Sequence, residues 1–162
     1  MLFWLYFALD DLDKSREYFK WYKKEFTDDT GEPIQILCWA VSLHRMKNDN
    51  EAKSVLADLM LSNIYLIPKI IGIDVQKYDM WHSSNIGDID YVEEIPVEVR
   101  ERIKESEIQW IKELYQSFDF RRIRKRYIEI FKQLQHTKEI EKRRKLLNES
   151  YGLLDSLQPK TS

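Results

Sequence analysis

The chain of 162 residues carries 26 Lys and Arg against 28 Asp and Glu, a net charge of −2, and 43% of it is apolar. This length fits one ordinary domain with a substantial core, and the apolar share excludes intrinsic disorder over most of the chain. Four glycines and four prolines are too few for the many turns of an all-β fold. Residues that lose little rotamer freedom in a helix are plentiful, so we predict an all-α protein.

A first pair of helices is predicted over residues 1–27. The first helix is predicted from about Leu2 to Leu9 within the apolar segment Met1–Leu9, and the acidic turn at 10–13 supplies an N-cap for the second. No basic residue precedes the apolar segment, no cleavage site follows it, and its length spans only about half a bilayer core. We therefore expect a core helix of a cytoplasmic protein without membrane contact. The second helix has more aromatic side chains than one buried stripe requires: Tyr18, Phe19, Trp21, Tyr22 and Phe26.

A second pair is predicted over residues 33–62. Pro33 opens its first helix at a position where the missing N–H costs nothing, and Asn48–Asn50 forms the turn to the next helix. The single cysteine, Cys38, cannot form an intramolecular disulfide and lies in the apolar run 34–46. A buried thiol in a reducing compartment is the expected state.

The helical period is lost after this pair. Residues 64–73 are nearly all apolar around Pro68 and Gly72, which predicts a short buried turn of helix. Residues 74–96 have no helical period, but the segment keeps large apolar residues, so we expect it to pack against the domain. These residues are Tyr78, Met80, Trp81, Ile86, Ile89 and Tyr91.

Helices resume after Pro96. A third pair is predicted over residues 97–136, and a last helix over 138–157 has a thin apolar stripe typical of a capping helix. Residues 158–162 are predicted to be a disordered tail. Residues 1–157 together form one domain in this interpretation.

The three helix pairs share one spacing of apolar positions. Ser15, Ala52 and Ile123 occupy equivalent places, separated by 37 and then 71 residues, the second close to two periods. A period of about 20 to 50 residues is typical of a solenoid, in which no unit buries its hydrophobic face alone.

The second pair resembles the tetratricopeptide repeat. Trp39 and Ala40 resemble the large and small pair of that family's first helix, and Ala52 its small residue at the helix crossing, with Leu56 and Leu59 where the second helix packs. The other two pairs match in spacing only, and the family's closing proline is absent. The resemblance covers about two thirds of the chain. It implies a right-handed superhelix of helical hairpins, with 74–96 as a degenerate segment and 138–157 as the cap.

In that family the first helices of successive repeats line a groove that holds a peptide or a partner helix. The resemblance therefore implies a non-enzymatic scaffold or adaptor that binds a protein partner. Carried over to this sequence, the groove residues are Trp4, Phe7, Leu37, Val41, His44 and Arg45. An alternative is a homodimer formed through the N-terminal aromatic face, near Trp4, Phe7, Trp21 and Phe26.

A basic stretch lies near the C-terminus. Residues 121–145 contain eleven Lys and Arg against three Glu, a local net charge of +8. We expect these side chains to be solvated or paired within the molecule, with an acidic protein partner as the next interpretation. A nucleic-acid partner is the least favoured, because the whole-chain pI is near 6.0 and few aromatic residues interleave. The densest part of the patch is Arg121, Arg122, Arg124, Lys125 and Arg126.

No catalytic residue, metal ligand set or cofactor site is predicted. Asp29–Gly31 spells the aspartic-protease triplet, but that chemistry needs two such carboxylates in strand-rich lobes, and this triplet lies in a turn between helices. His44, His82 and His136 are scattered, and Asp79 with His82 offers too few ligands for a metal ion.

Overall fold

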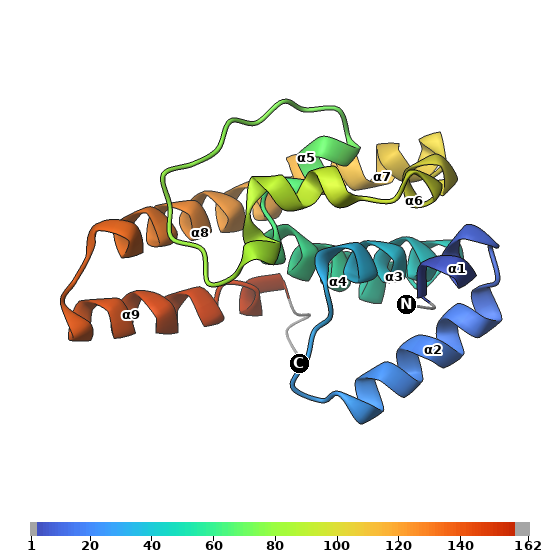
Figure 1. The fold of residues 1–162 in the computed structure, drawn as a ribbon, viewed down its shortest axis with the longest axis horizontal. Helices are drawn as coiled ribbons and strands as arrows, with labels where there is room; N and C mark the ends of the chain where they lie inside the picture. The colour runs from blue at the N-terminus through green and yellow to red at the C-terminus, as the bar shows by residue number, and fades with distance from the viewer. Residues whose placement is uncertain (1–2, 158–162) are drawn as a thin grey trace.

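The computed structural model describes residues 3–157, and this part of the chain contains helices and no strand (Figure 1). The prediction of an all-α protein is confirmed. Residues 1–2 and the predicted tail at 158–162 lie outside the described range. The α-helices are α1 (Phe3–Ala8), α2 (Leu12–Glu25), α3 (Pro33–Arg45), α4 (Asp49–Ser62), α5 (Leu66–Ile70), α6 (Val97–Arg102), α7 (Glu105–Gln116), α8 (Phe118–His136) and α9 (Ile140–Tyr151). The 3-10 helices are η1 (Asn85–Gly87), η2 (Ile89–Glu94) and η3 (Asp155–Leu157).

The helices begin and end where local chemistry predicts. The carboxylate of Asp11 accepts the backbone N–H of Lys14 at 3.0 Å and caps α2. Pro33 is the first residue of α3. The tight turns before α2 and after α3 place Asp10 and Lys47 in the left-handed region, with φ of 55° and 63°.

Helix α3 is the centre of the core. Every residue from Pro33 to Leu43 is buried, because α4, α1 and α2 all pack against α3. A helix that is apolar on all sides is stable only in such surroundings. Two polar side chains are buried with it, Gln35 and Ser42, and Ser42 donates its hydroxyl to the carbonyl of Cys38 at 2.7 Å.

The predicted helix pairs are present as α1 with α2, α3 with α4, and α7 with α8, but residues 3–157 do not form a solenoid. In a solenoid each repeat contacts only its neighbours. Here α1 packs directly against α6, and an ion pair joins α3 to α7, so the first two pairs both contact the segment 97–136 that was predicted as the third pair. The predicted capping helix forms as α9 and packs against α8.

The irregular segment 74–96 begins as a long connection that arcs over the helices in Figure 1 and ends in η1 and η2. Its first residues are exposed, but from Tyr78 onward it is bonded to the domain. The Tyr78 N–H donates to the Tyr65 hydroxyl at 3.0 Å, and the Trp81 N–H donates to the carbonyl of Phe131 at 3.0 Å. Met80 is buried. The prediction that this segment packs against the domain is confirmed from Tyr78 onward.

Candidate functional site

Half of the residues expected to line a groove lie in the core. Leu37 and Val41 are 0% exposed and Phe7 is 2% exposed. The resemblance assigned one face of α3 to a partner, but α1, α2 and α4 leave no face of this helix open. The expectation that these three side chains contact a partner is therefore corrected: they stabilise the fold.

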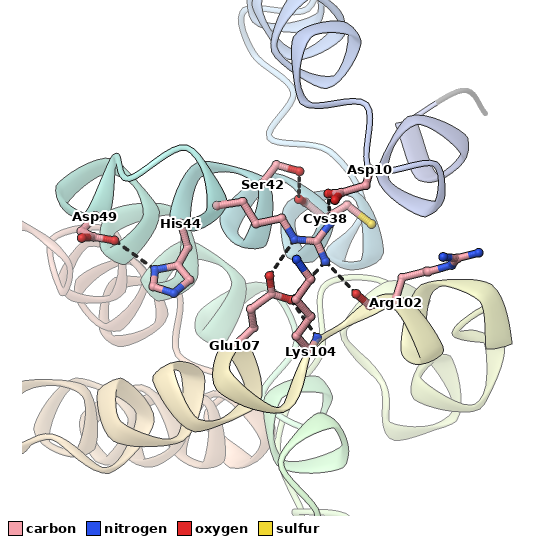
Figure 2. A network of polar contacts seen from close by, with 9 residues as sticks. Asp10, Cys38, Ser42, His44, Asp49, Arg102, Lys104 and Glu107 are labelled. Carbon is pink, nitrogen blue, oxygen red and sulfur yellow. Dashed lines mark hydrogen bonds and ion pairs between the residues drawn. The ribbon is translucent and has the colours of Figure 1, made fainter.

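Arg45 is the centre of a polar network whose partners Asp10, Arg102 and Glu107 are labelled in Figure 2. Its Nε and Nη2 donate to the two carboxylate oxygens of Glu107 on α7 at 2.6 and 3.1 Å. Its Nη1 donates to Asp10 at 2.9 Å, and Nη2 also donates to the carbonyl of Arg102 at 2.7 Å. The guanidinium carbon lies 4.6 Å from the centre of the Phe7 ring. Each of the three guanidinium nitrogens thus donates a hydrogen bond within the molecule.

The electrostatics of this network follow from its burial. The Arg45 and Glu107 side chains are only 7% and 4% exposed. Burial alone would lower the pKa of Arg45, but the hydrogen bonds and charges of Glu107 and Asp10 outweigh burial and leave the pKa raised. Glu107 also accepts the N–H of Lys104 at 2.8 Å and so caps α7. The arrangement joins α1, α3 and α7 and is structural.

The other two predicted groove residues are partly exposed. The His44 ring stacks on Trp110 with centroids 4.2 Å apart and an angle of 9° between the rings, and its Nδ1 lies 3.0 Å from a carboxylate oxygen of Asp49. Trp4 packs against the core with part of its ring in solvent. Of the predicted set, Phe7, Leu37 and Val41 share the hydrophobic core, Trp4 packs against it, and Arg45 lies over the Phe7 ring.

The basic patch on α8 is largely paired within the molecule. Arg124 donates to the carbonyl of Tyr115 at 3.0 Å and lies 3.7 Å from the centre of its ring. Arg126 forms a fork with Glu149 of α9 at 2.5 and 2.8 Å. Arg122 contacts Ser156 at 2.9 Å. The remaining two residues of the patch, Arg121 and Lys125, are exposed. This supports the interpretation of solvated and internally paired side chains.

Aromatic side chains gather on the outer side of α1 and α2. Helix α2 buries only Ser15 and Phe19, and Figure 1 shows its C-terminal end standing away from the other helices. Its aromatic rings contact one another in a row: Tyr18 to Tyr6 of α1 at 6.5 Å, Tyr18 to Trp21 at 5.7 Å, Trp21 to Phe26 at 5.7 Å, and Tyr22 to Phe26 at 5.0 Å. We call Tyr6, Tyr18, Trp21, Tyr22 and Phe26 the α2 aromatic face.

The α2 aromatic face is open to solvent. Trp21 is 50% exposed and Phe26 is 45% exposed. Contiguous exposed apolar patches on a protein are commonly sites of interaction. The excess of aromatic residues on α2 was a signal for this surface in the sequence. Two residues of the α2 aromatic face, Trp21 and Phe26, were expected to take part in self-association.

A pocket of about 240 Å³ lies between α2, α3 and α4, beside the α2 aromatic face. We call it the α2–α3 pocket. Within it, Phe19 stacks on Trp39 with ring centroids 4.3 Å apart. Burial, and then the hydrogen bond and charge of Asp29, raise the pKa of Tyr22 to about 12. Sequence reasoning missed this pocket. Its lining includes Phe19, Tyr22, Phe26, Asp29, Trp39 and Asp58.

Several residue types that carry chemistry elsewhere have structural positions here. Asp29 of the Asp-Thr-Gly triplet accepts the N–H of Gly31 at 2.8 Å, and Gly31 has a φ of +87°, so the triplet forms a turn. Cys38 is completely buried, and burial raises the pKa of its thiol. Among residues 3–157 we find no group of three or more His, Cys, Asp or Glu that could hold a metal ion. No helix in the same range is long and apolar enough to cross a membrane.

The fold and the site together define this chain as an all-α protein with an exposed aromatic face. Comparison of the chain with protein-family models, with curated proteins and with solved structures found no match. The relation to the tetratricopeptide repeat stays a prediction.

Proposed function

We propose that this chain is a non-enzymatic protein-interaction module whose α2 aromatic face docks a partner protein. The observation that carries the proposal is the contiguous row of rings in which Trp21 and Phe26 are about half exposed. Tyrosine and tryptophan are the residues most enriched among those that dominate binding energy at protein interfaces.

The energy available at this surface is of the right size for an anchor. Burying the exposed half of Trp21 would remove on the order of 100 Å² of apolar surface from water, which is worth about 2.5 kcal/mol. Phe26 offers a similar area because its exposed fraction is similar. Two such residues together match the contribution of a typical pair of interface hot spots.

Docking is assigned to the outer side of α2 and not to an inner groove, because the residues of α3 from Pro33 to Leu43 are all buried. The internal pairing of Arg124 and Arg126 favours a protein partner over a nucleic acid. The buried free thiol of Cys38 suits the reducing, cytoplasmic environment that we propose for this chain.

The test compares three forms of the chain as bait in a lysate of the native host. They are the wild type, Trp21→Ala, and Tyr151→Ala as a matched control, since Tyr151 is a 76% exposed aromatic residue on α9. We expect one defined protein to be retained by the wild type and the control and reduced at least tenfold with Trp21→Ala. Equal recovery by all three forms contradicts the proposal.

Light scattering across a concentration series separates a partner from a second copy. A mass that stays near 19.7 kDa at every concentration supports a different protein as the partner. A doubling of the mass that Trp21→Ala abolishes assigns the face to self-association instead. Circular dichroism of each variant checks that the helices are retained.

A further inference from the structure

The α2–α3 pocket has aromatic walls. Phe19, Tyr22, Phe26 and Trp39 line it, and the rings of Phe19 and Trp39 are stacked. Aromatic ring faces carry negative electrostatic potential and attract cations such as ammonium and guanidinium groups. The molecule itself already places a cation there, because the ammonium of Lys23 lies over the Trp39 ring at 5.7 Å from its centre.

The charges of the pocket also favour a cation. Asp29 and Asp58 both line it. Within residues 3–157 neither a hydrogen bond nor an ion pair reaches the Asp58 carboxylate. Desolvation raises the pKa of this carboxyl group, and the charge of Lys23 partly offsets that increase. Lys23 does not neutralise Asp58 fully, since its ammonium is bound to Glu51 at 3.1 Å. The pocket therefore keeps a carboxylate without a close partner.

The pocket is continuous with the surface proposed for docking, because Tyr22 and Phe26 belong to both. A side chain that projects from a docked partner could enter it. Its volume of about 240 Å³ accommodates the alkyl stem and head group of a long side chain. The stem would lie against the rings while the charged head reaches the carboxylates, as amphipathic side chains do elsewhere.

We propose that the α2–α3 pocket binds the side chain of a lysine or arginine of the partner protein, held between the aromatic rings and the carboxylate of Asp58. This inference rests on the proposed function, because it places one residue of that partner. A purely apolar side chain would leave Asp58 without a partner, and an acidic one would face Asp29 and Asp58.

The first experiment uses the labelled full chain and small analogues of the side chains. n-Butylguanidinium and n-butylammonium are titrated while the indole N–H of Trp39 is followed by NMR, with pentanoate and n-butanol as acidic and neutral controls. We expect saturable shifts with the two cations at millimolar concentrations, and at least fivefold weaker binding of the controls. Equal binding of pentanoate or butanol, or no saturable shift with the cations, overturns the proposal.

Two charge variants sharpen the test. Asp58→Asn removes the free carboxylate, so binding of butylguanidinium should weaken at least fivefold. Lys23→Met removes the competing ammonium, so binding should strengthen severalfold. Both positions are exposed, so neither substitution removes a buried contact of the core. The proposal is overturned if butylguanidinium binds both variants as it binds the wild type. It is also overturned if Lys23→Met binds the cation more weakly.

The partner assay distinguishes the two proposals from each other. Trp21 is not among the residues that line the pocket, whereas Asp58 is. Loss of the captured protein in both Trp21→Ala and Asp58→Asn supports both proposals. Loss in Trp21→Ala with unchanged capture in Asp58→Asn overturns the pocket proposal and leaves the docking face in place. In a third outcome, the analogues bind but Trp21→Ala does not reduce capture of the protein. That outcome contradicts the proposed function and also the proposal that a partner's side chain enters the pocket.

Discussion

The buried ion pair between Arg45 and Glu107 offers the most direct check on how the helices are assembled. It joins α3 to α7, positions that are 62 residues apart in sequence, and both side chains are almost fully buried. We predict that Arg45→Met is strongly destabilising, that Glu107→Leu is less so, and that the double variant loses much less stability than the sum of the two. Such a pattern arises only if the two side chains meet in the folded protein.

The size of the effect follows from the geometry. Opposite charges about 4 Å apart attract by roughly 4 kcal/mol at an effective dielectric constant near 20, whereas desolvation costs several kcal/mol for each ion. The pair as a whole is therefore close to neutral. Removal of Arg45 leaves Glu107 buried without a cation and costs about 3–5 kcal/mol, whereas removal of Glu107 costs less because Arg45 keeps its ion pair with Asp10. The double variant avoids that cost. It still loses the Arg45 contact with Phe7 and the Glu107 cap of α7, together about 2 kcal/mol.

Urea unfolding of the four proteins, followed by circular dichroism at two salt concentrations, measures the coupling. The exposed pair Arg126 and Glu149 is the matched control, because its side chains are 37% and 43% exposed and its coupling should be below about 1 kcal/mol. High salt should weaken the control pair and leave the buried pair unchanged. If the two substitutions at 45 and 107 add within about 0.5 kcal/mol, the side chains do not interact and the reasoning fails.

Two further predictions concern the core and acid stability. Leu37→Ala should lower the free energy of unfolding by about 2–5 kcal/mol, as is typical of a core residue. Trp21→Ala should lower it by about 1 kcal/mol or less. Equal effects of the two substitutions in urea unfolding would contradict the assignment of Leu37 to the core. The hydrogen bond from Lys77 lowers the pKa of Asp88, so its stabilising effect is present above about pH 4 and is lost as the pH falls through the folded-state value. Thermal unfolding of Asp88→Asn should therefore change less between about pH 4 and 2 than the wild type does, and parallel curves would refute this.

Local chemistry made much of the helical organisation predictable. The acidic turn before α2 and Pro33 at the start of α3 each satisfy or replace backbone groups at a helix end. These effects act over three or four residues, so the sequence alone displays them. The pairing of Arg126 with Glu149 of α9 is not local in this sense, because the two residues are 23 positions apart in sequence.

The placement of α3 was not predicted, although its composition contains the reason. Residues 34–43 include only two polar side chains, Gln35 and Ser42, and such a helix has no face suited to solvent or to a reversible partner. The resemblance to a repeat family assigned Leu37 and Val41 to an open groove, because the family's register was carried over without weighing this composition. The contact of Arg45 with Glu107 had no local signal, since no periodicity links residues so far apart.

Helix α2 has more aromatic residues than its packing against the core requires. To cover Trp39, α2 needs one ring, and Phe19 supplies it. The other four rings of the helix and its C-terminal end, Tyr18, Trp21, Tyr22 and Phe26, stay wholly or partly in water. Such rings contribute little to folding while they are exposed, because the hydrophobic effect depends on area removed from water. Exposed rings of this kind also reduce solubility, and this cost is the physical reason for proposing that a partner covers all four together.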